Sequence, residues 1–106
     1  MIAEKLTGIY LIVSFNWPEK LTREMADNAA KLHASLADGS WIKETLAASG
    51  GIGAGPSSIW VFWLEDYAAL DRLLKDKDDP ISQAYFNFFS QMVDVSDSIR
   101  EEVLFR

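Results

Sequence analysis

Cysteine is absent from this chain of 106 residues, and histidine occurs only once, at His33. The lack of cysteine excludes disulfide bonds, thiolate metal sites and thiol nucleophiles. With one histidine, any metal site would need carboxylates for its other ligands. The acidic run 76–79 also lacks the glycine and the terminal glutamate of a calcium-binding loop. We therefore predict no metal and no cofactor.

Positive charge is scarce as well. Ten Lys and Arg residues are scattered among sixteen Asp and Glu residues, which gives a net charge of −6. Nucleic acids and anionic membranes are bound by clustered cations, so we expect neither as a partner. No apolar run approaches the roughly 20 residues needed to span a bilayer. The N-terminus also lacks a signal-peptide pattern, and these absences predict a cytoplasmic protein.

What the chain does contain is strand-like sequence that is apolar on both sides. Alternate residues of a strand face opposite sides of a sheet. In 57–65 one side would carry Ile59, Val61 and Trp63, and the other Trp60, Phe62 and Leu64. The segment 6–15 has the same property, and its set Ile9, Leu11 and Val13 is expected to face the helices. A chain of 106 residues can cover one face of such a sheet with its own helices but has few residues left to cover the second. We therefore predict a homodimer joined through the second face.

Hydrophobic periodicity and capping signals divide the chain into strands and helices. The predicted strands are residues 3–16, 41–49, 57–65 and 99–105, with a turn at 95–98. The first helix is predicted to begin at Asn16-Trp17-Pro18-Glu19 and to end at Asp38-Gly39. The second is predicted from Asp66 to about Lys75, and a further helix to start at Asp79-Pro80. The strand 41–49 is expected near a sheet edge, because Lys43 and Glu44 interrupt its apolar positions.

This βαββαβ order predicts a single domain over residues 1–106 with the ferredoxin-like α+β fold, a four-stranded antiparallel sheet with helices on one face. The glycine-rich segment 50–55 invites comparison with a phosphate-binding loop. It ends in Pro56 and enters a strand without a lysine, which favours a hairpin or bulged turn.

The chain resembles the dimeric α+β barrel superfamily. The resemblance rests on Ile59-Trp-Val-Phe-Trp, on Tyr67 opening the next helix, and on Asp79-Pro80 before Tyr85-Phe86. Within that superfamily, residues 57–105 are most similar to NIPSNAP-like domains. The resemblance implies two sheets packed face to face in a closed barrel with the helices outside. Haem-degrading members use a histidine on the later helix, and because 66–93 has none, that activity is not supported.

Four side chains are candidates for acid–base chemistry. His33 lies at the border of a helical apolar stripe, where it is either a base facing a pocket or a partly exposed helix residue. Glu65 is either a buried proton shuttle or a strand-end carboxylate that reaches solvent or pairs with Arg100. Tyr10 and Tyr85 are the phenols that could act beside them.

Thirteen aromatic residues, four of them tryptophan, are a large share for this length. They indicate either a wall for a flat apolar ligand or core and dimer contacts. The candidate ligand-binding residues are Trp17, Trp41, Trp60, Trp63 and Phe88.

Two functions follow from these observations. The first is a small homodimeric module that binds an apolar or aromatic molecule or has a structural role. The alternative is a cofactor-independent monooxygenase or isomerase acting on an aromatic or polyketide-like substrate. Whether the protein is an enzyme depends on whether His33 and Glu65 share a cavity with a tyrosine.

Overall fold

The computed structural model describes residues 8–105. Residues 3–7, which the sequence assigned to the first strand, lie outside the described residues. The strands are β1 (Ile9–Asn16), β2 (Ile42–Ser49), β3 (Ser58–Leu64) and β4 (Val93–Glu101). The helices are α1 (Arg23–Leu36), α2 (Tyr67–Lys75) and α3 (Pro80–Phe89).

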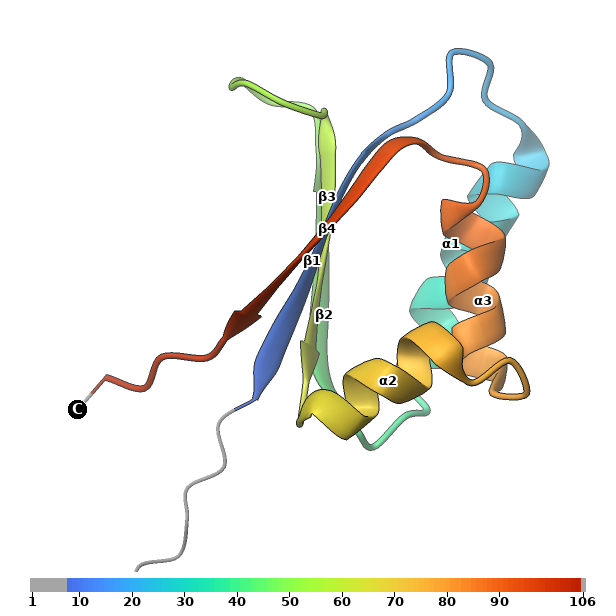
Figure 1. The fold of residues 1–106 in the computed structure, drawn as a ribbon. Coiled ribbons are helices and arrows are strands. Elements are labelled where there is room, and N and C mark those ends of the chain that lie inside the picture. Colours follow the sequence, from blue (N-terminus) through green and yellow to red (C-terminus); the bar gives the residue numbers. More distant parts are fainter. Residues whose placement is uncertain (1–7, 106) are drawn as a thin grey trace, which may run out of the picture.

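The strands form one antiparallel sheet in the order β2-β3-β1-β4, with the helices on one side of it (Figure 1). The ferredoxin-like α+β fold is therefore confirmed. The expected edge position of residues 41–49 is also confirmed, since β2 is an outer strand. The two doubly apolar segments, β1 and β3, are the central pair.

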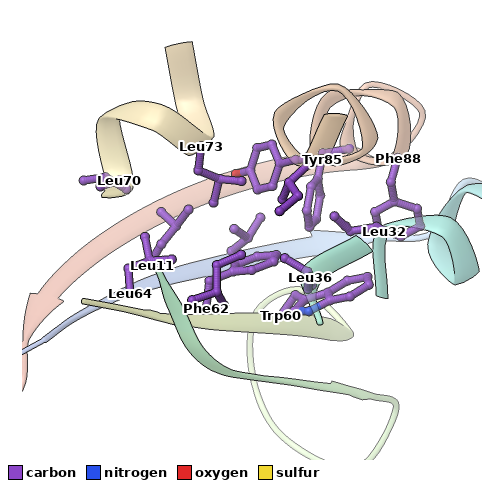
Figure 2. Packing of buried hydrophobic residues seen from close by; sticks show 14 of the residues in the cluster. Leu11, Leu32, Leu36, Trp60, Phe62, Leu64, Leu70, Leu73, Tyr85 and Phe88 are labelled. Atoms are coloured by element: carbon purple, nitrogen blue, oxygen red, sulfur yellow. The ribbon is translucent and has the colours of Figure 1, made fainter. Parts of the chain in front are cut away.

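The helix-covered face holds the core. Ile9, Leu11 and Val13 of β1 are at most 2% exposed, which confirms the predicted orientation of this strand. Trp60, Phe62 and Leu64 of β3 lie on the same face and are also buried. Tyr85 and Phe88 descend from α3 onto these strands (Figure 2). Burial of these large rings, together with the aliphatic side chains around them, stabilises the fold.

Two helix starts agree with the predicted caps and one does not. The carboxylates of Asp66 and Asp79 accept hydrogen bonds from the backbone N–H groups of Ala69 and Ile81, both at 2.8 Å. The predicted start of α1 at Asn16–Glu19 was wrong. Its cap is Thr22, whose hydroxyl accepts a hydrogen bond from the Met25 N–H at 3.2 Å.

The last strand begins earlier than predicted. Residues 95–98 were expected to turn, because Ser96, Asp97 and Ser98 are polar. They instead pair with β1, where Ser96 lies opposite Ser14 and Ser98 opposite Ile12. Pairing with a central strand overrides their weak strand propensity. The chain turns at residues 90–92, before β4 begins, and Asp94, at a φ of 55°, lies within β4 where the register with β1 shifts.

The second face of the sheet carries none of the three helices (Figure 1). We call it the open face. The strand registers arrange its side chains in three rows that run from β2 to β4. The first row is Glu44, Trp63, Tyr10 and Arg100; the second is Leu46, Val61, Ile12 and Ser98; the third is Ala48, Ile59, Ser14 and Ser96.

Candidate functional site

A pocket of about 370 Å³ opens between α1 and the edge of the sheet at β2. It is lined by Phe15, Trp17, Ala29, Ala30, His33, Ala47, Ala48, Ser49, Ile59, Trp60 and Phe88. The hollow exists because alanines occupy both walls: Ala29 and Ala30 on α1, Ala47 and Ala48 on β2. Side chains this small leave the gap between helix and strand unfilled.

Aromatic rings form the inner wall of the pocket. Trp17 and Trp60 each contact Phe88 edge-on, with ring centroids 5.4 Å apart in both pairs. The indole Nε1 of Trp60 donates to the Thr45 hydroxyl at 2.6 Å, and that hydroxyl donates to the Val61 carbonyl at 3.0 Å. The one polar atom of Trp60 is thus satisfied, so this wall offers a ligand an apolar surface.

Among the described residues that line this pocket, His33 is the only titratable one. It lies in the last turn of α1 and its side chain is exposed. It also lines a second hollow of about 240 Å³, beside Lys43, Glu44 and Thr45 of β2. An imidazole at this border can donate or accept one hydrogen bond to a molecule seated against the aromatic wall.

The other three acid–base candidates lie elsewhere. Tyr10 is on the open face, where its ring stacks on that of Trp63 with the two ring centroids 5.9 Å apart. Glu65 is exposed just beyond β3, and within residues 8–105 it forms no ion pair with Arg100 or any other cation. Tyr85 is buried in the core, where burial and then the negative charge of Asp97 raise the pKa of its phenol.

The five aromatic candidates divide in a similar way. Trp17, Trp60 and Phe88 line the pocket with His33. Trp63 lies on the open face and Trp41 is buried near the start of β2, with the Arg72 guanidinium 4.8 Å from its ring centroid. The structure therefore joins three predicted aromatics with the histidine and separates the other two.

The alanine walls were missed by the sequence analysis. The signal that could have found them is a pair of adjacent alanines on a helix, Ala29-Ala30, and another on a strand, Ala47-Ala48. Where a packed core would have larger side chains, alanine can leave a cavity. Only the fold shows that these two pairs of alanines line the same pocket.

Two other features are absent from residues 8–105. No three His, Asp or Glu side chains there are placed to hold a metal ion. None of the described helices combines the length and the apolar character that crossing a bilayer requires.

No protein-family model matches the chain, and no curated protein matches it. Solved structures do match. A dimeric ferredoxin-like protein of unknown function from Thermobifida fusca is 18% identical, with a TM-score of 0.66 over 98% of this chain and 97% of that chain. A hydroxynitrile lyase from Passiflora edulis is 12% identical, with a TM-score of 0.72 over 92% and 95%. An ethyl tert-butyl ether D (EthD) family protein from Bacillus halodurans is 13% identical, with a TM-score of 0.63 over 91% and 99%.

These likenesses cover nearly the whole length of each chain, and they agree with the ferredoxin-like α+β fold described above. At such low identity they show the fold alone, because one scaffold serves unrelated chemistries.

Proposed function

We propose that this protein is a homodimeric binding module. Two copies join through the open faces of their sheets, and each copy binds one small, flat apolar or aromatic molecule between α1 and β2. The observation that carries the binding function is the lining of the pocket: aromatic rings on the inside, alanines on both walls, and His33 as the sole titratable group.

The dimensions and chemistry of the pocket define the ligand. Its volume of about 370 Å³ lies in the range of small-molecule sites, toward the lower end. The Trp60 indole already donates to Thr45 and Phe88 has no polar side-chain atom, so a hydrophobic ring system fits against these two rings better than a polar one. His33 at the border favours a single oxygen or nitrogen on the outward edge of that ring system.

The homodimer rests on the open face and on one structural relative. Ile12, Val61 and Leu46 form an apolar middle row that no helix covers. Exposed apolar patches bounded by polar residues are typical of protein interfaces. The similar protein from Thermobifida fusca is described as dimeric, which supports the same assembly here.

Titration with 2-naphthol, followed by tryptophan fluorescence, tests the binding site, since Trp17 and Trp60 line it. Ala30→Leu adds bulk inside the pocket, whereas Ala34→Leu makes the same change on the exposed surface of the same helix. We expect Ala30→Leu to weaken binding by roughly fivefold or more and Ala34→Leu to leave it unchanged. Equal affinities for both variants would place the probe elsewhere and overturn the proposal.

A proton-transfer enzyme of the cofactor-independent monooxygenase or isomerase kind is the second candidate. The observation that favours it is His33 at the border of an apolar pocket, where a lone base can reach a bound substrate. With Glu65, Tyr10 and Tyr85 outside the pocket, His33 would act without them. His33→Gln should then abolish turnover of an active substrate while leaving its binding intact; unchanged turnover would remove this candidate.

Two finer predictions continue to rest on the sequence alone. They are the cytoplasmic location, predicted from the lack of a spanning apolar run and of a signal-peptide pattern, and the likeness of residues 57–105 to NIPSNAP-like domains.

A further inference from the structure

The first row of the open face has opposite charges at its two ends. Glu44 lies at the β2 edge and Arg100 at the β4 edge, with Trp63 and Tyr10 between them. Both charged residues are exposed, and neither has an ion-pair partner among residues 8–105.

The neighbouring charges on this face are already engaged. Glu102 accepts hydrogen bonds from the Gly8 N–H at 2.8 Å and from the Trp63 indole at 3.1 Å. The ammonium group of Lys43 lies 3.9 Å from the same carboxylate oxygen and 4.7 Å from the centroid of the Trp63 ring. Glu44 and Arg100 are therefore the charged residues of the three rows, and among residues 8–105 neither has an ion-pair partner.

Symmetry limits how two copies of this face can meet. Packed sheets run either aligned or near right angles, and homodimers are usually twofold symmetric. If the strands of the two sheets cross near right angles, the twofold axis runs diagonally across the three rows and the four strands. Depending on the diagonal, either Glu44 faces its own copy or Arg100 faces its own copy. A twofold axis perpendicular to the strands, in the plane between the two sheets, places the first row of one copy over the third row of the other. Neither Glu44 nor Arg100 then faces a residue of opposite charge.

An axis parallel to the strands gives a different result. Each first row then lies over its own copy in reverse order, so Glu44 faces Arg100 of the partner subunit, and this happens twice. Trp63 faces Tyr10 of the partner subunit in the same row. In the second row Val61 faces Ile12 of the partner subunit, so apolar residues meet in the middle.

We propose that two copies of this chain dock with the twofold axis parallel to the strands, held in register by reciprocal Glu44–Arg100 ion pairs. A hollow of about 230 Å³ beside Glu44, lined also by Tyr10, Leu46, Val61 and Trp63, offers space for the guanidinium group of Arg100 of the partner subunit. Guanidinium groups stack well on aromatic rings of this kind. This docking rests on the proposed homodimer and specifies its geometry.

Charge reversal tests the pairing. Glu44→Arg or Arg100→Glu alone places like charges opposite each other twice per dimer, and we expect each to raise the dimer dissociation constant at least tenfold. The double variant restores opposite charges and should return to within threefold of the unchanged protein. Glu19→Arg and Arg23→Glu make the same charge changes at exposed positions before and at the start of α1, outside the sheet, and serve as controls. Sedimentation equilibrium over a dilution series measures the dissociation constants of the five variants and of the unchanged protein.

The absence of cysteine permits a second test. Facing sheets lie about 10 Å apart, so a short bismaleimide, rather than a disulfide, can bridge introduced thiols. A mixture of Glu44→Cys protein and tagged Arg100→Cys protein should give mixed cross-linked dimers, while each protein alone gives none. Self-cross-linking of either protein would show orthogonal docking and overturn the proposed axis.

The outcomes separate the docking from the dimer itself. The variant Ile12→Asp places a carboxylate in the middle of the open face. Circular dichroism is used to check that this variant is folded. If it dissociates while the charge reversals have no effect, the homodimer stands and the docking is wrong. If the unchanged protein is a monomer at micromolar concentration, the homodimer and the docking both fail.

Discussion

Asp79 stabilises two elements from one buried position. Its carboxylate caps α3 through the Ile81 N–H and pairs with the Arg72 guanidinium of α2. Burial alone would raise the pKa of this carboxyl. The hydrogen bonds from Arg72 and from the backbone of Ile81 and Ser82, together with the Arg72 charge, outweigh burial and lower it.

We expect Asp79→Asn to lower the free energy of unfolding by about 1 kcal/mol at pH 7, because asparagine keeps the cap but loses the pair with half-exposed Arg72. A lowered pKa contributes stability above the unfolded value of 3.8, and that contribution is lost as the pH falls through the folded value. The difference between the two proteins should therefore shrink below about pH 4. Urea unfolding between pH 7 and pH 2.5 measures it, with the exposed neighbour change Asp78→Asn as control.

Tyr85 contributes its ring to the core. The ring centroid lies 5.5 Å from that of Phe62 and 4.7 Å from that of Phe89. Burial and the nearby Asp97 raise the pKa of the phenol, so it stays neutral at physiological pH. This environment differs from the pocket that contains His33.

Tyr85→Phe should therefore leave 2-naphthol affinity unchanged within twofold and alter stability by no more than about 1 kcal/mol. Tyr85→Ala should cost about 3–5 kcal/mol, because it removes a buried ring. Fluorescence titration and urea unfolding supply the two readouts. A large loss of binding in Tyr85→Phe, with stability intact, would mean that the phenol belongs to the binding site.

At the scale of elements, the start of α1 gives a direct test of capping. Thr22→Ala removes the hydroxyl that accepts the Met25 N–H and should cost about 0.5–2 kcal/mol. Thr22→Ser keeps the hydroxyl and should cost less. Thermal unfolding followed by circular dichroism compares them, and an equal loss in both variants would contradict the cap.

Elements with strong local signals could be predicted from the sequence, and those set by their neighbours could not. The helices after Asp66 and Asp79 begin with residues whose carboxylates bond backbone N–H groups nearby, a purely local effect. Asn16 looked like a cap, yet its side chain accepts the Ser57 N–H at 2.8 Å and donates to Asp94 at 3.2 Å. These partners lie far along the sequence, so no local pattern reveals them.

The same distinction applies to the candidate site. Periodicity placed Trp60 and Phe88 on apolar faces, and the composition drew attention to His33. The pocket itself depends on α1 lying over β2 with alanines on both sides. That juxtaposition follows from the packing of α1 against α3 and the sheet rather than from either segment alone.

At the scale of the whole molecule, the open face predicts the assembly. The chain carries a net charge of −6, so bringing two copies together costs electrostatic repulsion that apolar contact must overcome. We expect the unchanged protein to sediment as a dimer at micromolar concentration and Ile12→Asp to sediment as a monomer. Moderate salt should strengthen the dimer of the Glu44→Arg variant, because it screens the facing like charges.

The strand β2 contributes to both proposed surfaces. Its Ala48 and the opposing Ile59 line the pocket, and the same two residues form part of the third row of the open face. Occupancy of the pocket and association of the chains are then reciprocal: a ligand that binds the dimer tenfold more tightly than the monomer strengthens dimerisation through each filled pocket by that factor. The apparent ligand affinity would rise with protein concentration, so a dilute sample would understate it. If the proposed dimer and binding pocket both hold, the shared strand makes the abundance of the chain a determinant of how much of such a ligand it retains.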